Sequence, residues 1–349
     1  MLCISEATCR VFLYRLIHSI LENPTRLGPT EFWENFDGGK LTVIPQAKKP
    51  RPVGQKNLIY KLITSINGRK HDKALVELAG PAHLAGKPNG VLAAALMTQM
   101  ELDYMQCRVE LDPNDIRVIL TTDAEAAFQS TSRKHCYDVL CSEPTLRDRF
   151  APFFAHTHMG AQRVYWPAAK VLLTPSSGFT QGDVNSSKLF TCNTASLVAG
   201  LQAASPVDAT VVAIMDDITI MGTLNAVFYI ECARDRLQTP VNYLVNTSKQ
   251  YAMIEAQVEH IQLALPNHTV IYVGNEYGFN ISGILLGGEA YMTAKLQKIL
   301  IKRNKSSQIF QSWTMCKIND PSFSMHSREN PTPTRSCPNQ LIKTFCPRT

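Results

Sequence analysis

The sequence predicts an α+β fold in which an antiparallel sheet is backed by helices. Three observations support this prediction. Residues 211–221 read VVAIMDDITIM, two β-branched apolar runs around a pair of carboxylates, which is typical of a tight hairpin. Residues 117–122 (RVILTT) have the same strand composition and end at Asp123. Segments with apolar residues three or four positions apart lie between these strands, and this spacing predicts amphipathic helices.

Length and composition narrow the class of protein. A chain of 349 residues can bury a large core as one extended domain with subdomains or as two domains. No apolar run has the length of a membrane span, and the N-terminal segment lacks the features of a secretion signal. The ten cysteines of the chain form no C-x-x-C pair. We therefore expect an intracellular protein with reduced thiols and no membrane partner.

Basic residues are concentrated between positions 46 and 73, although the net charge is only +6. The single acidic residue in this segment is Asp72. Such a cluster favours an anionic partner, either phosphate or nucleic acid, and the alternative is a solvated basic face. The basic residues are Lys48, Lys49, Arg51, Lys56, Lys61, Arg69, Lys70 and Lys73.

The first half of the chain predicts the following elements in order. Phe12, Leu16 and Ile20 recur every four residues and predict a helix near the N-terminus. Residues 40–44 alternate as a strand does, and the basic loop that follows contains three prolines. Residues 57–66 and 91–104 have helical spacing. After the strand 117–122, a helix capped by Ser130 or Ser132 is expected to run to about residue 141.

The second half begins with an alternating run at residues 170–174 and the stretch SSGFTQGDVNSSKLF at 176–190. Helices are expected at 188–201, 226–237 and 250–265, with the Asp-Asp hairpin after the first of them. Residues 269–273 and 279–285 suggest a second hairpin. After residue 305, many prolines and polar residues without apolar periodicity predict a disordered or poorly packed tail.

Three carboxylates carry the functional prediction. Asp123 ends one β-branched strand, and Asp216 and Asp217 lie between two others. If these strands are neighbours in one sheet, the carboxylates converge, as in sites that hold two Mg²⁺ ions about 3.5–4 Å apart for phosphoryl transfer. The backbone carbonyl of Ala124 is a further candidate ligand, and Mn²⁺ is the alternative metal. For the Asp-Asp pair by itself, the competing interpretation is a solvated acidic turn.

The order of motifs resembles that of reverse transcriptases, most closely those of non-LTR retrotransposons and group II introns. The matching segments are Arg51-Pro52, DAEAAF at 123–128, Gly178 to Phe190 against a G-x-x-Q-G-D-x-x-S-P-x-L-F pattern, IMDD at 214–217, NTSK at 246–249 and GILLGG at 283–288. The match extends from about residue 40 to residue 288. The sequence departs from the family at several positions. Ser187 stands where the pattern has proline, and Val184 stands where the family has a further proline after Gly-Asp. Ile214-Met215 precede the paired Asp, where the family often has Ala or Tyr.

The resemblance implies a right-hand polymerase with a palm and fingers, and a thumb that is absent or truncated. It divides the chain into an N-terminal helical segment (1–40), fingers (41–122), a palm (123–290, with a fingers insertion at about 130–170) and a thumb start with a tail (291–349). The chain would then be a fragment or decayed copy of a larger element, nuclear if the retroelement is eukaryotic.

The resemblance also implies roles for single residues. Asp123, Asp216 and Asp217 would be catalytic and, with Ala124, would hold two Mg²⁺ ions. The nucleotide-binding residues would be Lys49, Arg51, Phe128, Gln181, Gly182 and Lys249. Phe128 would exclude a 2′-hydroxyl, although an aromatic residue at such a position is also a core candidate. Contacts with nucleic acid would come from Lys56, Lys61, Arg69, Lys70 and Gly287.

The expected partners are an RNA template, a DNA or RNA primer and dNTPs, and the expected reaction is RNA-directed DNA synthesis. Two alternatives stay open. One is a catalytically silent relative that only binds nucleic acid. The other is an RNA-dependent RNA polymerase, which shares the palm and the Asp-Asp hairpin. Those enzymes usually have an acid or Asn where Phe128 stands, and Phe128 therefore disfavours them.

Overall fold

The computed structural model describes residues 6–22, 36, 38–44, 51–108, 112, 115–160, 163–204, 207–256, 265–273, 278–281 and 284–301. Two compact units are present, Met1–Thr293 and Ala294–Thr349. The described residues of the second unit, 294–301, are helical. Within the described ranges, no helix is both long enough and apolar enough to cross a bilayer. The tail predicted after residue 305 and the basic-loop residues 45–50 lie outside the described residues.

A five-stranded sheet is the centre of the first unit. Its strand order is β6-β7-β3-β8-β9, and every pair is antiparallel except β8–β9. The strands are β3 (Arg117–Thr122), β6 (Ala209–Ile214), β7 (Asp217–Thr223), β8 (Tyr251–Ile254) and β9 (Thr269–Tyr272). The sequence analysis predicted β3 and the β6–β7 hairpin from their β-branched residues, and both are confirmed.

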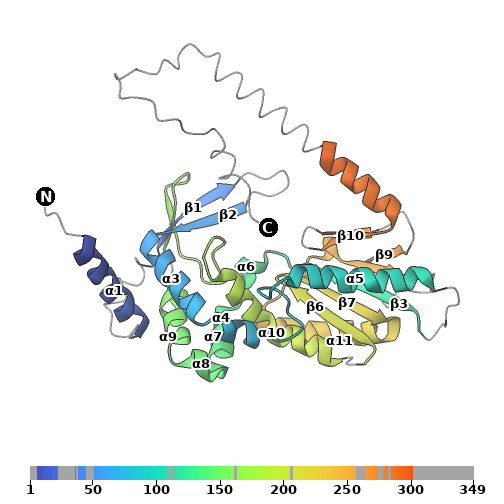
Figure 1. Ribbon diagram of the computed structural model, residues 1–349, viewed down its shortest axis with the longest axis horizontal. Helices are drawn as coiled ribbons and strands as arrows, with labels where there is room; N and C mark the ends of the chain where they lie inside the picture. The colour runs from blue at the N-terminus through green and yellow to red at the C-terminus, as the bar shows by residue number, and fades with distance from the viewer. Residues whose placement is uncertain are drawn as a thin grey trace, which may run out of the picture. The chain divides into compact units, whose positions relative to one another are not determined.

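Both faces of this sheet are covered by apolar side chains. Successive side chains of each strand point to opposite faces, so each strand contributes to both layers. Ile119, Val212 and Met253 pack with apolar residues of α5 (Gly90–Cys107) on one face. Val118 and Leu120, with residues of the same strands offset by one position, pack on the other face against α10 (Ser186–Ala204) and α11 (Leu224–Val241). Figure 1 shows α5 along the strands and α11 across the sheet from it.

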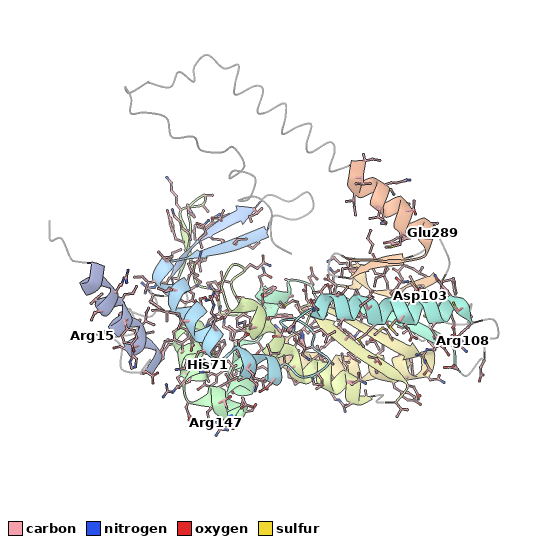
Figure 2. All side chains as sticks on the ribbon, in the orientation of Figure 1. Arg15, His71, Asp103, Arg108, Arg147 and Glu289 are labelled. Carbon is pink, nitrogen blue, oxygen red and sulfur yellow. The ribbon has the colours of Figure 1, made fainter. Side chains whose placement is uncertain are left out.

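The end of the sheet remote from Asp123 is closed by ion pairs. Arg108 follows α5 and is labelled in Figure 2; its Nη1 lies 2.9 Å from Glu255 Oε1. The same Glu255 oxygen accepts a hydrogen bond from the backbone N–H of Arg117 at 2.7 Å, at the start of β3. These contacts fix the beginning of β3, and Asp123 follows the opposite end of the same strand.

The first unit also contains a four-stranded sheet of order β2-β1-β4-β5, a two-stranded sheet and a group of helices. Asn57 caps α3, as its Oδ1 accepts a hydrogen bond from Tyr60 N at 2.7 Å, and Ser132 caps α7. The elements are α1 (Glu6–Glu22), β1 (Gly39–Ile44), β2 (Arg51–Lys56), α3 (Leu58–Lys70), α4 (Asp72–Leu78), α6 (Ala127–Ser130), α7 (Arg133–Ser142), α8 (Pro144–Arg147), α9 (Phe150–Phe154), η2 (Ala155–Met159), β4 (Val164–Trp166) and β5 (Val171–Leu173).

Two predicted elements are wrong. The helix expected at 250–265 begins instead as β8, which pairs with β3. Its three consecutive buried residues, 252–254, suit a central strand as well as a buried helix, and the tertiary pairing decides between them. The hairpin expected between 269–273 and 279–285 does not form. β9 joins β8, and β10 (Gly278–Ile281) pairs with β11 (Ile284–Gly287).

The predicted division of the chain stays a prediction. Within the range 41–122 that it gives to the fingers, β3 and α5 belong to the five-stranded sheet and its covering layer. Such a layer cannot be recognised from local sequence, because α5 lies far along the chain from most of the strands it covers.

Candidate active site

The register of the central strands brings the three predicted carboxylates to one end of the sheet. β3 and β7 are antiparallel, with Thr122 opposite Ile218. Asp123 is therefore one position beyond the last pair on β3, and Asp217 stands directly before Ile218 on β7. Asp216 lies in the turn that precedes β7. The sequence analysis required this neighbourhood, and the structure provides it.

The turn between β6 and β7 is displaced by one residue from the predicted one. Asp217 is already in the ladder, opposite Ile214, so the two turn residues are Met215 and Asp216. Met215 has φ +54°, a left-handed conformation usually taken by glycine at the first position of such a turn. A non-glycine residue there costs roughly 1–3 kcal/mol and persists only where its surroundings hold it.

Tyr243 supplies part of that support. Its hydroxyl donates a hydrogen bond of 2.6 Å to the backbone carbonyl of Asp216, and the ring is buried. Burial, followed by the nearby charges of Asp216, Asp123 and Asp217, raises the pKa of this phenol well above its ordinary value. Tyr243 thus remains a neutral donor that fixes the turn. Sequence reasoning missed it, because a lone tyrosine in a loop has no recognisable pattern.

The carboxylates influence one another electrostatically. Burial raises the pKa of Asp216 from its ordinary 3.8 to about 6, and the negative charges of Asp217 and Asp123 add to this effect. A carboxylate held in this way gains from any cation that approaches it. This site therefore favours binding of positive charge at the end of the sheet.

One cation is already present. Lys249 Nζ lies 2.6 Å from Asp123 Oδ2, and this hydrogen bond is the main reason why the pKa of Lys249 is raised. Asn246 Nδ2 also donates to Asp123 Oδ2, at 3.3 Å, and the backbone N–H of Asn246 donates to the Asp123 carbonyl at 2.8 Å. Lys249 is in the short helix η3 (Thr247–Lys249). The NTSK segment is therefore next to the strand end that carries Asp123.

The oxygen donors suit Mg²⁺, which prefers carboxylates, carbonyls and water. Ala124 forms an antiparallel bridge with Val245 whose two hydrogen bonds are made by the neighbouring residues on each strand. The carbonyl of Ala124 therefore points away from Val245, toward the β7 side of β3. As the side chains lie, however, no three His, Cys, Asp or Glu residues in the described part of the chain are grouped to hold a metal ion. Asp123 is turned toward Lys249 instead.

The loop with Gln181 and Gly182 packs against the strand that begins with Arg51. Gly54 N donates to the carbonyl of Gln181 at 2.8 Å. Gly182 has φ +96°, and a Cβ atom there would lie 2.9 Å from the carbonyl oxygen of Gly54. Gln181 Oε1 is buried and has no hydrogen-bond partner among the described residues. Of the predicted residues in this loop, Gln181 is thus the one with an unused acceptor.

Phe128 lies on α6, five positions after Asp123 in the sequence. Its ring centre is 5.2 Å from that of Phe190, and the side chain is half-buried against the main apolar core. Phe128 is therefore a packing residue on one side, and its remaining surface is exposed. Packing and a role in nucleotide selection are compatible here.

The predicted basic residues occupy different environments. Lys49 lies outside the described residues, and Arg51 opens β2 opposite Ile44. Lys61 is half-buried and Arg69 is exposed, while Lys70 Nζ lies 3.5 Å from Glu22 Oε1. Lys56 differs from the prediction. Only 5% of it is exposed, and its Nζ lies 5.3 Å from the centre of the Tyr60 ring, so it serves the interior rather than a nucleic-acid surface.

Two further predicted or missed residues complete the description. Gly287, on β11, has φ +146°, and its N–H donates to Gln99 Oε1 at 3.3 Å, which ties the β10–β11 hairpin to α5. Arg234 of α11 was not predicted. It is buried, with Nη1 3.3 Å from Thr122 Oγ1 and Nη2 2.8 Å from Glu231 Oε2. Arg234 thus supports the residue directly before Asp123.

Comparisons with known proteins bear on the fold. No protein-family model and no curated protein matches the sequence. The structure is similar to telomerase from Candida albicans in complex with the TWJ fragment of telomeric RNA, with a TM-score of 0.52 and 12% sequence identity over 75% of this chain and 46% of that chain. For apo telomerase from Candida tropicalis, truncated from its C-terminal domain, the TM-score is 0.48 and the sequence identity 11%. That match covers 73% of this chain and 54% of the telomerase chain.

The chain thus spans about half the length of these telomerase structures. Telomerase belongs to the reverse transcriptases, and the match to the Candida albicans protein shows that this chain has a reverse-transcriptase-like fold. The predicted α+β architecture of palm and fingers, with helices behind an antiparallel sheet, is confirmed.

Proposed function

We propose that this chain is the RNA-directed DNA polymerase domain of a retroelement, of the type found in non-LTR retrotransposons and group II introns. The observation that carries the proposal is the β3–β7 register, because it places Asp123 beside the turn that holds Asp216 and Asp217. The order of motifs in the sequence supports the same function. The substrates would be an RNA template, a primer with a free 3′-hydroxyl, and dNTPs.

Each residue then has a task that follows from its position. Asp123, Asp216, Asp217 and the Ala124 carbonyl would hold two Mg²⁺ ions, which stabilise the attacking 3′-oxygen and the leaving pyrophosphate when bound. Asp123 would exchange Lys249 for metal, and the released ammonium would neutralise the triphosphate or protonate the leaving group. Lys49 and Arg51 would contact phosphate oxygens, Arg51 as a bidentate donor.

The remaining residues would select and orient substrates. Phe128 would exclude the 2′-hydroxyl of a ribonucleotide, and Gln181 with Gly182 would contact the nascent base pair, since glycine allows the backbone to approach closely. Lys61, Arg69, Lys70 and Gly287 would contact the template and primer. Together these contacts would hold a primer end and a nucleotide at the carboxylates.

Primer extension tests the proposal. With an RNA template, dNTPs and Mg²⁺, we expect the wild type to extend the primer, and Asp216→Asn to extend it at least about 100-fold more slowly. Asp138→Asn removes an exposed carboxylate whose ion-pair partner in the described part of the chain is Lys134 on the same helix, and it should leave the rate unchanged. Unfolding of each variant is followed by circular dichroism, so that lost activity is separated from lost structure.

One observation favours the silent relative as a second candidate: Asp123 is bound to Lys249 and the carboxylates are not grouped around a metal position. A well-folded wild type that binds primer–template but adds no nucleotide would support that candidate and contradict ours. A preference for ribonucleotides would instead indicate an RNA polymerase. The three outcomes are distinguished in one assay by supplying dNTPs and rNTPs in parallel.

A further inference from the structure

A buried carboxylate joins the helix α3 to the loop that contains Gln181. Asp183 is 8% exposed, and its Oδ2 accepts a hydrogen bond of 2.5 Å from the Tyr60 hydroxyl, whose side chain is fully buried on α3. Its Oδ1 accepts from the backbone N–H of Asn185 at 3.0 Å. Hydrogen bonds to an ionised group are strong, and withdrawal from water strengthens them further. Tyr60 and Asp183 thus form a firm link across 123 positions of sequence.

The same face of α3 holds the loop at two more points. Asn185 Nδ2 donates to the carbonyl of Thr64 at 2.9 Å. A Cβ atom on Gly68 would lie 2.1 Å from Asn185 Oδ1, so the absence of a side chain there allows the contact. Tyr60, Thr64 and Gly68 are spaced four residues apart and therefore lie on one face of the helix. One face of α3 is devoted to this loop.

The opposite side of the loop contacts β2. Besides the bond from Gly54 N to the Gln181 carbonyl, a Cβ atom on Gly54 would lie 2.0 Å from Thr180 Cγ2. The loop is therefore enclosed between α3 and the strand that begins at Arg51. Its position determines where the unpartnered Gln181 Oε1 lies relative to that strand.

We propose that Tyr60 and Asp183 are positioning residues, whose hydrogen bond sets the Gln181–Gly182 loop against β2 and thereby the binding of the incoming nucleotide. This inference rests on the proposed polymerase function, because the ligand of the loop is a dNTP only in that case. Neither residue touches the reacting atoms. Both act through the placement of Gln181 and of the adjoining strand.

The test uses Tyr60→Phe in the full chain, since this change removes one oxygen atom and keeps the ring in place. We expect the KM for dNTP to rise about tenfold with kcat within about twofold, as for one lost bond to a buried carboxylate. Hydrogen exchange of the Gly54 amide, which donates to Gln181, should accelerate about tenfold in the same variant. Asp183→Asn removes the charge and leaves one acceptor oxygen for two donors, the Tyr60 hydroxyl and the Asn185 N–H, so we expect a rise in KM at least as large as that of Tyr60→Phe.

Tyr229→Phe is the matched control, because Tyr229 lies on α11 with 64% of its surface exposed. It should change neither readout. Unchanged exchange at Gly54 in well-folded Tyr60→Phe and Asp183→Asn overturns the inference, and so does faster exchange without any change in KM. If the wild type itself incorporates no nucleotide, the polymerase function fails, and the exchange measurement still decides whether Tyr60 holds the loop.

Discussion

Lys249 Nζ lies 2.6 Å from Asp123 Oδ2, so that the carboxylate at the end of β3 is neutralised by a lysine 126 positions later in the chain. Both groups are held by the backbone, because Asn246 N donates to the Asp123 carbonyl just before η3 begins. Lys249 is bonded to one carboxylate oxygen of Asp123, and a metal ion at that oxygen would have to displace it. Cation binding at this carboxylate is therefore a competition between an ammonium group and a metal.

This competition predicts the effect of Lys249→Met. Without the ammonium, Asp123 is available to metal, and we expect the Mg²⁺ concentration for half-maximal primer extension to fall about threefold, a modest effect because Lys249 is more than half exposed. The maximal rate should also fall, since a charge near the leaving group is lost. Lys134→Met, in an exposed ion pair with Asp138, is the control. An unchanged or higher Mg²⁺ requirement in Lys249→Met would contradict the competition.

Asp216 predicts a pH dependence of stability. Its pKa is raised from 3.8 to about 6, so the native state binds more protons than the unfolded state between these pH values. The free energy of unfolding therefore falls as pH rises from about 4 to 7. The full shift corresponds to about 3 kcal/mol, and we expect about 1–2 kcal/mol because Asp216 keeps some contact with water.

The substitution Asp216→Asn isolates this contribution, because an amide does not titrate in this range. In urea denaturation without metal, the variant should equal the wild type at pH 4 and exceed it by about 1–2 kcal/mol at pH 7. Asp138→Asn should show no such gain. Equal stability of Asp216→Asn and wild type at pH 7 would mean that the ionised Asp216 carboxylate does not destabilise the fold. The argument for cation binding would then lose its electrostatic basis.

Phe128 predicts the choice of sugar. If the exposed part of the ring excludes a 2′-hydroxyl as proposed, a smaller side chain admits it, and we expect Phe128→Val to lower the ratio of kcat/KM for dNTP over rNTP about tenfold. The change also costs about 1–3 kcal/mol of stability, because the partly buried ring packs against Phe190 and the main apolar core. Phe228→Val is a matched control, since Phe228 on α11 is partly exposed and makes an edge-to-face contact with Tyr229. If both variants keep the wild-type ratio, Phe128 is a core residue only.

The part of the fold that could be predicted is the part with local signals. The hairpin 211–221, the strand before Asp123 and the helix after Asn57 are recognisable from β-branched runs, apolar spacing and a cap. The segment 250–265 was not, since a short apolar run suits a strand or a helix and the neighbouring β3 decides between them. The pairing of β9 with β8 instead of β10 also depends on tertiary contacts that the local sequence does not reveal.

The candidate site shows the same division. The carboxylates and the NTSK lysine belong to motifs with fixed spacing, and the structure brings them together. The turn was displaced by one residue, because Met215 adopts a positive φ that its side chain does not favour. Tyr243, Arg234 and Tyr60 were missed for another reason. Each acts through a single long-range hydrogen bond, and nothing in the local sequence reveals the partner.

Gly182 offers a test that separates backbone strain from contact. Gly182 and Gly80 both have positive φ, +96° and +83°. Alanine disfavours this left-handed conformation, so Ala at either position lowers the free energy of unfolding by about 1–2 kcal/mol. A Cβ atom at Gly80 meets nothing within 4 Å, whereas at Gly182 it lies 2.9 Å from the Gly54 carbonyl oxygen. The difference between the two variants therefore measures how tightly the Gln181–Gly182 loop is packed on β2.

We expect Gly182→Ala to lose at least about 1 kcal/mol more than Gly80→Ala in urea denaturation, and to raise the KM for dNTP while Gly80→Ala leaves it unchanged. The reason is that backbone atoms cannot move aside as a flexible side chain would, so the loop itself must shift away from β2. Equal losses of stability in the two variants, with equal KM values, would show that the loop has room to move and that its contact with β2 does not position the nucleotide.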